Sequence, residues 1–457
     1  MTEPAVVADL TALLPAGAVT VDPEVMAAFS RDHSERPLPG MPLALVRPAS
    51  TADVQAVLRV ASTHTIPVVV RGAGSGLSGG STAVDGCLIL SVDRMREVRV
   101  DAAARVVHAQ PGALNAEVKA AAAAQGLWYP PDPASYEFCS IGGNVATNAG
   151  GLCCVKYGVT TDYVLGMTVV LADGRALTLG GDRVKDAAGL SLTKLFVGSE
   201  GTLGVITEVT LRLIPAPERP ASLVATFAEV DAAVQAVLQI SASLRPAMLE
   251  FMDRTTIGAV EDLTHMGLDR DAAAMLIVQS DAPGDQAAAE LNRIERICLD
   301  AGATECVLTD DPDDGEAFVA ARRMAVPAVE MKGSMLLEDA GVALPRLGDL
   351  VRGIQRISSD RGVVIALIAH AGDGNTHPML VFDRADPDSF ARAQQAFDDI
   401  MALTISLGGT ISGEHGIGRL KQPWLERQLG QDAMALTQTI KAALDPRGIL
   451  NPGVIVR

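Results

Sequence analysis

Four glycine-rich clusters in the first half of the chain constrain its fold more than any other feature. In the first, a β-branched run that starts at Pro67 leads directly into Arg-Gly-Ala-Gly-Ser-Gly-Leu-Ser-Gly-Gly, which ends at Gly80. Backbone N–H groups in such a loop can approach a phosphate closely, because no Cβ stands in the way. The other clusters are residues 111–112, 141–151 and 197–207. One such cluster is as easily a simple turn, but four in one domain favour a phosphate-binding role.

The first loop also matches GxGxxG at residues 74–79, but its context argues against a Rossmann fold. The Rossmann fingerprint must open a helix, whose N-terminus then holds the pyrophosphate. Here the loop continues into Ser-Thr-Ala-Val-Asp-Gly and then into a strand-like run at residues 88–90. We therefore expect a pyrophosphate-binding loop that connects two strands.

Two histidines flank a tight turn in the second half of the chain. His370 follows an apolar, β-rich run at residues 363–369, and His377 precedes a similar run at residues 379–382. Gly-Asp-Gly-Asn, at residues 372–375, has the Asp-Gly chemistry that closes hairpins. A hairpin here would bring the two imidazoles side by side.

A carboxylate completes the pattern of a metal site. Glu414 lies in Ser-Gly-Glu-His-Gly-Ile-Gly, at residues 412–418. Two histidines and one carboxylate bind a divalent cation and leave open positions for a substrate. With His370, His377 and Glu414 as ligands, His415 stays available as a base. We expect zinc, with manganese or iron as alternatives.

Length and composition fit an enzyme with more than one domain. The 457 residues exceed the size at which one core keeps growing. No apolar run approaches the ~20 residues that cross a bilayer, and the first residues lack the basic region of a secretory signal. Six cysteines without a CxxC pair indicate reduced thiols in a cytoplasmic protein with no iron–sulfur cluster of its own. A net charge of −18 argues against nucleic acid as a partner.

The pattern of elements predicts an α+β fold. Strand-like runs alternate with Ala-rich helices up to residue 216, and three prolines in residues 214–220 indicate a linker. From residue 221, strands and long helices predict a second α+β domain that is covered on one face. The tail from residue 411 is expected to be helical as far as residue 445. The predicted domains are residues 1–218, 219–410 and 411–457.

Seven motifs in order carry a resemblance to a known family. They are RGAGSGLSGG, PPDPAS, IGGNVATNAGG, GSEGTLGVIT, AHAGDGNTH, SGEHGIG and DPRGILNPG, between about residues 42 and 454. The chain resembles the FAD-dependent 2-hydroxy-acid dehydrogenases of the vanillyl-alcohol-oxidase/p-cresol-methylhydroxylase (PCMH) superfamily, which include glycolate oxidase, D-lactate dehydrogenase and D-2-hydroxyglutarate dehydrogenase. The resemblance implies a PCMH-type FAD-binding domain of two α+β subdomains, a cap domain with an antiparallel sheet, and a C-terminal segment that returns to the flavin.

The resemblance also implies which residues contact FAD. The pyrophosphate would be held by Arg71, Gly72, Ala73, Gly74, Ser75, Gly76, Leu77, Gly79 and Gly80. The flavin side would meet Pro131, Asp132, Ser135 and Asn375. The isoalloxazine and ribityl chain would lie along Gly142, Gly143, Asn144, Thr147, Asn148 and Gly151. The adenine end would lie near Glu200, Gly201, Gly204 and Ile206. Because the first loop has Ser75 rather than the histidine that some relatives link to FAD, we expect non-covalent FAD.

The implied reaction is the oxidation of a 2-hydroxy acid. A hydride must leave the substrate carbon, and a cofactor is required because no side chain accepts one. The metal would chelate the hydroxyl and carboxylate oxygens and lower the pKa of the alcohol. His415 would then remove the hydroxyl proton while the hydride passes to flavin N5. By resemblance, Arg322 would grip the substrate carboxylate, with Arg323 as the neighbour that could be confused with it.

Departures from the pattern of D-2-hydroxyglutarate enzymes favour a small substrate of the D-lactate or glycolate type. Those relatives carry an asparagine where this chain has Met379, and a lysine in the region where it has Glu338 and Asp339. A D-2-hydroxyglutarate dehydrogenase remains the alternative, and a metal-dependent hydrolase or a flavin-binding accessory subunit of an oxidase are alternatives of another class.

The sequence leaves the partners open. The electron acceptor could be a quinone, a cytochrome, an electron-transfer flavoprotein or an iron–sulfur subunit, and use of O2 is not distinguished. Peripheral membrane association through such partners and a homodimer are both compatible with the sequence.

Overall fold

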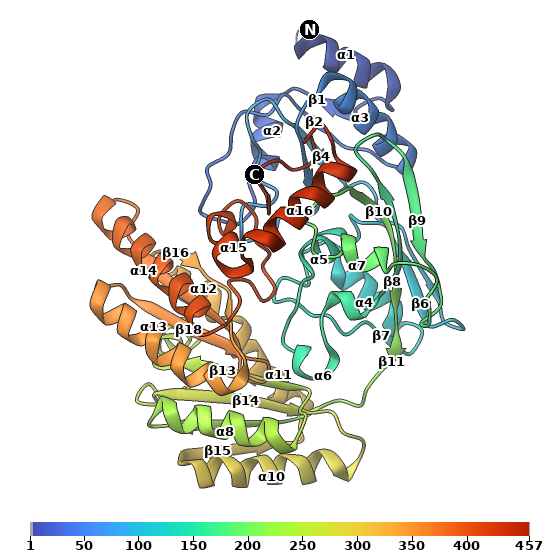
Figure 1. The fold of residues 1–457 in the computed structure, drawn as a ribbon. Helices are drawn as coiled ribbons and strands as arrows, with labels where there is room; N and C mark the ends of the chain where they lie inside the picture. The colour runs from blue at the N-terminus through green and yellow to red at the C-terminus, as the bar shows by residue number, and fades with distance from the viewer. Residues whose placement is uncertain (1–2, 457) are drawn as a thin grey trace. The chain divides into compact units, whose positions relative to one another are not determined.

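The computed structural model describes residues 3–456, which form two compact units (Figure 1). The first unit contains the chain up to Gly150, then Val159–Ala216 and the segment from Glu414 onward. The second unit contains Gly151–Gly158 and Pro217–Gly413. The sequence placed the boundaries at 218/219 and 410/411, and it did not separate residues 151–158 from the first domain. Within the described residues, no helix is both long and apolar enough to cross a membrane.

The first unit begins with a four-stranded sheet in the order β1-β2-β4-β3. Its strands are β1 (Val19–Thr20), β2 (Ala44–Val46), β3 (Val68–Arg71) and β4 (Leu88–Ser91), and its helices are α1 (Glu3–Leu13), α2 (Pro23–Phe29) and α3 (Thr51–His64). Strand β4 runs parallel to both β2 and β3. Helix α3 begins where the Ser50 side chain accepts from the N–H of Asp53, and its apolar face packs into the core. The glycine loop therefore connects two parallel neighbouring strands, as expected, and no helix follows it.

A second, antiparallel sheet of the first unit has the order β5-β6-β10-β8-β9. Its strands are β5 (Val98–Asp101), β6 (Val106–Ala109), β8 (Val164–Val170), β9 (Ala176–Gly180) and β10 (Val205–Arg212). Nearby elements are α4 (Asn115–Ala123), α5 (Ile141–Thr147), η1 (Thr160–Asp162) and α7 (Leu192–Phe196). The expected linker is partly structured, because β11 (Ile214–Pro215) pairs with β7 (Leu127–Trp128). This two-stranded sheet tolerates Pro215, whose missing N–H matters little at an edge.

The C-terminal part of the first unit contains α15 (Gln422–Leu429) and α16 (Gln431–Leu444). The expectation of a helical tail from residue 411 was therefore wrong for the first eleven residues. Glycines at 413, 416 and 418 explain the difference, since Gly416 and Gly418 have positive φ values of 83° and 54° that a helix cannot contain.

The second unit is built on one eight-stranded antiparallel sheet, ordered β15-β12-β14-β13-β18-β19-β16 with β17 paired to β19. Its strands are β12 (Ala221–Phe227), β13 (Met248–Asp253), β14 (Ala274–Ser280), β15 (Ala303–Thr309), β16 (Ser334–Leu337), β17 (Ala340–Gly341), β18 (Ile365–His370) and β19 (Asn375–Phe382). The α+β class and the antiparallel sheet of the second domain are confirmed.

Helices cover this sheet in two groups. One group comprises α8 (Val230–Ser243), α10 (Asp285–Ala301), α13 (Leu347–Arg361), which is preceded by η2 (Leu344–Arg346), and α14 (Pro387–Ser406). The other comprises α9 (Arg254–Thr264), α11 (Pro312–Arg323) and α12 (Ala325–Glu330). The short helix α6 (Cys154–Tyr157) packs against β13. The expectation of a sheet covered on one face was wrong, because both of its faces carry apolar side chains that need covering.

Asp253 ends β13 and caps helix α9. Its Oδ1 accepts hydrogen bonds from the N–H of Thr256 at 2.9 Å, the hydroxyl of Thr256 at 2.7 Å and the N–H of Leu367 at 3.0 Å. Burial nevertheless raises the pKa of the Asp253 carboxyl to about 6, with the hydrogen bonds opposing it. The folded state thus holds this proton over a wider pH range than the unfolded chain does.

We predict that Asp253 makes the protein less stable as pH rises. The pKa of Asp253 is near 4 in the unfolded chain and about 6 in the folded protein, so between these pH values the folded state binds more protons than the unfolded chain. The stabilisation that protonated Asp253 gives to the folded state is therefore complete at low pH and is lost as the pH rises through about 6. In Asp253→Asn, the amide oxygen can accept the same three bonds without a charge. The stability of the variant relative to the wild type should therefore rise by about 1 kcal/mol between pH 5.5 and pH 8.

Urea denaturation monitored by circular dichroism at the two pH values measures this difference. Asp253→Ala is the control, because it removes the three bonds at every pH. Identical pH profiles for the wild type and the asparagine variant would contradict the prediction.

Candidate active site

Two adjacent strands place the expected metal-binding histidines on one face of the second unit's sheet. The predicted hairpin is confirmed, since β18 and β19 pair through the turn at residues 371–374. In its register His370 lies opposite Asn375 and His377 lies opposite Ile368, so the two histidines are diagonal neighbours. Side chains two residues apart share a face, and the imidazole centroids are 5.0 Å apart with the rings nearly perpendicular, at 81°.

A buried carboxylate on a third strand holds His370. Glu250 in β13 is the direct cross-strand partner of His370 in β18. Its Oε1 lies 2.7 Å from Nδ1 of His370, and its Oε2 lies 2.8 Å from Nη2 of Arg322. The Glu250 side chain is 0% exposed, and Arg322 and His370 are also buried.

Arg322 is the arginine that reaches this face, and Arg323 is not. Arg322 lies in the last turn of α11 and is 3% exposed. Arg323 forms an ion pair with Glu316 at 2.9 Å, and Glu316 is 66% exposed. Within the described chain, Nε of Arg322 donates no hydrogen bond although it is buried. A buried donor of this kind costs free energy unless a ligand satisfies it, so its presence fits an anionic group such as a carboxylate.

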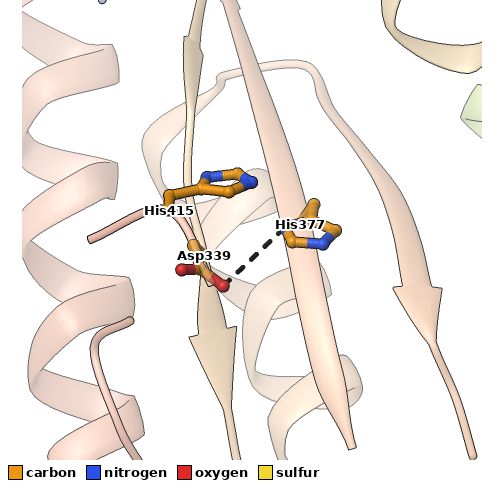
Figure 2. A group of neighbouring side chains, drawn as sticks. All are labelled: Asp339, His377 and His415. Carbon is orange, nitrogen blue, oxygen red and sulfur yellow. Dashed lines mark ion pairs between the residues drawn. The ribbon is translucent and has the colours of Figure 1, made fainter. Parts of the chain in front are cut away.

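The ring of His377 is also fixed by contacts at its Nδ1 atom. Its Nδ1 lies 3.3 Å from the carbonyl oxygen of Glu338. It also lies 3.9 Å from Oδ1 of Asp339, and Figure 2 draws this ion pair. Asp339 is fully buried and accepts a hydrogen bond of 2.8 Å from the Ser412 hydroxyl at its other oxygen. Asp339 therefore adds a buried acid beside His377, while Glu338 contributes its backbone carbonyl.

Glu414 and His415 follow directly after a segment that is anchored in the second unit. Thr410 and Gly341 exchange two backbone hydrogen bonds, and Gly413 lies so close to Asn375 that a Cβ would be 2.4 Å from its side-chain oxygen. The second unit ends at Gly413, and Glu414 and His415 open the C-terminal segment of the first unit. Nε2 of His415 is 3.8 Å from Oε1 of Glu414.

His370 and His377 belong to the second unit, whereas Glu414 and His415 belong to the first. The set of His370, His377 and Glu414 as metal ligands therefore stays a prediction. Because Nδ1 of each strand histidine faces an acceptor, the Nε2 atoms carry the lone pairs that a metal needs. The donor set of two imidazoles and a carboxylate fits a divalent ion of the zinc, manganese or iron type.

The glycine loop of the first unit has the features of a phosphate cradle. No N–H group from Gly74 to Leu77 donates a hydrogen bond to the described residues. Gly74 has a φ of 78°, and a Cβ there would lie 2.0 Å from Nη2 of Arg71. Ala73 donates to the hydroxyl of Ser140, which connects this loop to the third glycine cluster. These unused donors fit the phosphates of a dinucleotide.

The third glycine cluster forms helix α5, which the sequence analysis missed. The Ser140 side chain caps the helix by accepting from the N–H of Gly143, and the helix ends at Asn148 in the left-handed conformation. The signal was present, since a serine precedes the run and an asparagine ends it. Asn144 is buried and accepts a hydrogen bond of 3.1 Å from Asn115. The N-terminus of α5 therefore lies beside the first loop.

The other residues expected to contact FAD are spread over four places in the chain. Arg71 ends β3, and Gly72, Ser75, Gly76, Leu77, Gly79 and Gly80 belong to the first loop. Pro131, Asp132 and Ser135 lie between β7 and α5, while Gly142, Gly143 and Thr147 lie in α5 and Gly151 follows it. Glu200, Gly201 and Gly204 precede β10, which contains Ile206. Their contacts with FAD, and that of Asn375 with the flavin, stay predictions.

Glu200 has a structural partner that the sequence did not indicate. It is 6% exposed and accepts hydrogen bonds from the N–H groups of Ile417 at 2.7 Å and Gly418 at 2.8 Å. Burial raises the pKa of the Glu200 carboxyl to about 7, and these two bonds oppose the increase. Glu200 thus fastens the C-terminal segment within the first unit.

Glu250 is the site residue that sequence reasoning missed altogether. The only signal was an acid within Met-Leu-Glu-Phe-Met, a run of β13 that is otherwise apolar. Such a residue is buried together with its neighbours, and a buried carboxylate needs a partner.

Two family models match the chain. The model for the C-terminal domain of FAD linked oxidases matches residues 216–455, and the FAD binding domain model matches residues 42–180. Glycolate oxidase subunit GlcD of Bacillus subtilis is 40% identical over 416 residues, which span 90% of this chain and 88% of that protein. The GlcD subunit of Escherichia coli K12 is 41% identical over 90% of this chain and 83% of its own length. The D-lactate dehydrogenase of Archaeoglobus fulgidus is 34% identical over 90% of this chain and 91% of its own length.

Solved structures share the fold at low sequence identity. p-Cresol methylhydroxylase with substrate bound superposes with a TM-score of 0.84 at 18% identity, covering 99% of this chain and 96% of its own. 4-Ethylphenol oxidase from Gulosibacter chungangensis gives 0.82 at 19% identity, covering 99% and 97%. The family model and the relatives show that the chain belongs to the FAD-linked oxidases, which are oxidoreductases, and the solved structures show that it has the PCMH-type fold.

Proposed function

We propose that this flavoprotein oxidises a small D-2-hydroxy acid, of the D-lactate or glycolate type, to the 2-oxo acid. The relatives named glycolate oxidase subunit and D-lactate dehydrogenase support an oxidation of hydroxy acids. The observation that carries the proposal is a buried cluster of side chains on one face of the second unit's sheet. In it, Nδ1 of each of the two histidines faces a hydrogen-bond acceptor, and Nε of the nearby arginine donates no hydrogen bond within the described residues.

Two groups from outside the chain complete the proposed site. His370, His377 and Glu414 would hold a divalent metal, and the loop from Arg71 to Gly80 would hold the pyrophosphate of non-covalent FAD. When bound, the metal supplies Lewis acidity that lowers the pKa of the alcohol, and FAD supplies the acceptor for the hydride.

Arg322 would bind and orient the substrate carboxylate. A guanidinium can donate two parallel hydrogen bonds to a carboxylate, which fixes both distance and direction. The contact with Glu250 uses Nη2 and leaves Nε for the substrate. Burial of Arg322 excludes water, so these bonds are stronger than at a surface.

His415 would take the proton of the substrate hydroxyl. An imidazole is suited to this step because it titrates near neutral pH. Its side chain is 12% exposed, so a proton accepted from the substrate can be passed on to solvent. His415 follows Glu414 directly in the chain, so the proposed base is adjacent in sequence to a proposed metal ligand.

The acid beside His377 supports a monocarboxylate as the substrate. Asp339 is fully buried, and its Oδ1 lies 3.9 Å from Nδ1 of His377. A second carboxylate on the substrate, as in D-2-hydroxyglutarate, would meet negative charge here instead of a cation. D-2-Hydroxyglutarate is therefore the less favoured substrate.

Membership in the FAD-linked oxidases gives no support to the hydrolase alternative.

The proposed oxidation also requires a partner that takes up the electrons. The curated name of the GlcD relatives describes a subunit, which supports a proposal that this chain also delivers electrons to another protein. A quinone, a cytochrome, an electron-transfer flavoprotein and an iron–sulfur subunit are the acceptors to test, and the cytoplasm is the proposed location.

The visible spectrum of the purified protein under anaerobic conditions tests the proposed function. Addition of D-lactate or glycolate should bleach the flavin band, and prior removal of metal by a chelator should prevent the bleaching. L-Lactate is the stereochemical control, and D-2-hydroxyglutarate tests the alternative substrate. A flavin that no 2-hydroxy acid reduces, in protein that contains metal, would overturn the proposal.

Two histidine variants should separate proton transfer from metal binding. His415→Asn is expected to lower kcat roughly 100- to 10,000-fold, the usual contribution of a general base, and to keep metal and FAD. His377→Asn should lose metal and activity together. Metal analysis and steady-state kinetics distinguish the two outcomes, and loss of metal from both variants would argue against the assigned roles.

A conservative substitution tests Arg322. Arg322→Lys keeps the charge but cannot make two parallel bonds, so kcat/KM should fall roughly 10- to 100-fold, mainly through a higher KM. Arg323→Lys is the matched control, because Arg323 pairs with the exposed Glu316. Equal effects in the two variants would remove Arg322 from substrate binding.

Two glycine variants test the FAD loop. Gly74→Ala places a Cβ against the guanidinium of Arg71, which also donates to the carbonyl of Arg31 at 2.7 Å. We expect FAD to bind roughly tenfold more weakly because the cradle must distort. Gly86→Ala is the control, since Gly86 has a similar φ of 69° but nothing within 4 Å of the new Cβ. Equal FAD affinities, measured by flavin fluorescence, would contradict a role of the loop.

A further inference from the structure

We infer that Glu250 is the positioning residue that holds His370 and Arg322 together, so that binding of metal and binding of the substrate carboxylate depend on one buried side chain. This inference rests on the proposed function, because it assigns His370 to the metal and Arg322 to the substrate. It adds a residue to the site that does not itself contact either.

The strand register creates this arrangement. Glu250 and His370 are direct partners in neighbouring antiparallel strands, so their side chains leave the sheet on the same face. The two carboxylate oxygens then face different partners, with Oε1 at 2.7 Å from Nδ1 of His370 and Oε2 at 2.8 Å from Nη2 of Arg322. The contact with His370 is a hydrogen bond, whereas the contact with Arg322 is an ion pair without hydrogen-bond geometry.

Stability alone does not explain an acid at this position. Met248 and Met252, which share its face of β13, are buried in the apolar core formed with α9, α11 and α12. Removing a carboxylate and a guanidinium from water costs more than an average ion pair returns, and apolar replacements of buried pairs are often neutral or stabilising. A methionine or leucine at residue 250 would suit the core, so the acid is explained by what it positions.

The carboxylate decides which nitrogen of His370 carries the proton. In the ion pair with Arg322, the oxygens of Glu250 can only accept hydrogen bonds. Nδ1 of His370 must therefore donate, which leaves the lone pair on Nε2, the atom available to a metal. A histidine that is held in this way is also a more basic ligand.

Glu250→Gln reverses this choice of proton position. The guanidinium of Arg322 has no acceptor, so the glutamine must turn its oxygen toward Arg322 and its NH2 group toward His370. Nδ1 of His370 must then accept, which moves its proton to Nε2 and blocks the metal-binding atom. The substitution keeps the shape of the side chain, so the effect comes from hydrogen-bond direction and charge rather than from packing.

The first measurement is the ¹⁵N spectrum of histidine rings in metal-free protein labelled at its seven histidines, with His370 assigned from its absence in His370→Gln. His370 should be protonated at Nδ1 in the wild type and at Nε2 in Glu250→Gln. The second is competition with a chelator, in which the variant should bind metal roughly 10- to 100-fold more weakly. KM for the hydroxy acid should also rise, because Arg322 loses its ionic partner.

Two further variants make the test specific. Asp253→Asn is the matched control, since Asp253 is a buried carboxylate three residues along the same strand whose bonds go to Thr256 and Leu367. It should leave the His370 spectrum and metal affinity unchanged. Glu250→Asp keeps two acceptor oxygens and should restore part of the metal affinity.

The outcomes separate this inference from the proposed function. If wild-type protein binds metal and Glu250→Gln binds it equally well, with His370 still protonated at Nδ1, Glu250 does not position the site. If wild-type protein binds no divalent metal at all, the metal part of the proposed function fails, and the ring spectra alone then decide whether Glu250 sets the proton of His370.

Discussion

The candidate site depends on the register of three antiparallel strands. Glu250 lies opposite His370, and His377 lies opposite Ile368, so that all three polar side chains share one face of the sheet. A slip of one residue in either pairing would turn a side chain to the other face. The tight turn at residues 371–374 limits such a slip in the β18–β19 hairpin, and the Glu250–His370 hydrogen bond supports the pairing of β13 with β18.

In the first unit, contacts with the C-terminal segment fix the glycine loop, which has almost no side chains of its own. Ser78 accepts backbone hydrogen bonds from Arg419 and Leu420, and its hydroxyl donates to the carbonyl of His415 at 3.1 Å. Arg419 also donates to the carbonyl of Gly79 at 3.0 Å. Buried Glu200 fastens the same C-terminal segment at Gly418. Glycines keep the N–H groups of the loop accessible, and polar residues that are distant in sequence keep the loop in place.

Periodicity and turn chemistry predicted much of the fold. The strand expected at residues 88–90 and the His370–His377 hairpin lie where the sequence placed them, because apolar runs bounded by turn residues are local signals. Helix α5 was missed because its glycines have low helix propensity, and its stability comes from the Ser140 cap and from packing. The helical tail was predicted eleven residues too early because the structural requirement of Gly416 and Gly418 for positive φ was not recognised.

The sequence by itself determined the family, the PCMH-type α+β class and the residue types that could hold FAD, a metal and a substrate carboxylate. These are carried by short contiguous motifs, in which glycine spacing and paired histidines have a direct chemical meaning. Only the tertiary structure decided that Arg322 rather than Arg323 pairs with buried Glu250, and that Glu250 joins it to His370. The two contacts are between residues 72 and 120 positions apart in the chain, and burial strengthens both. Strand register and helix packing create such contacts, and no local pattern encodes them.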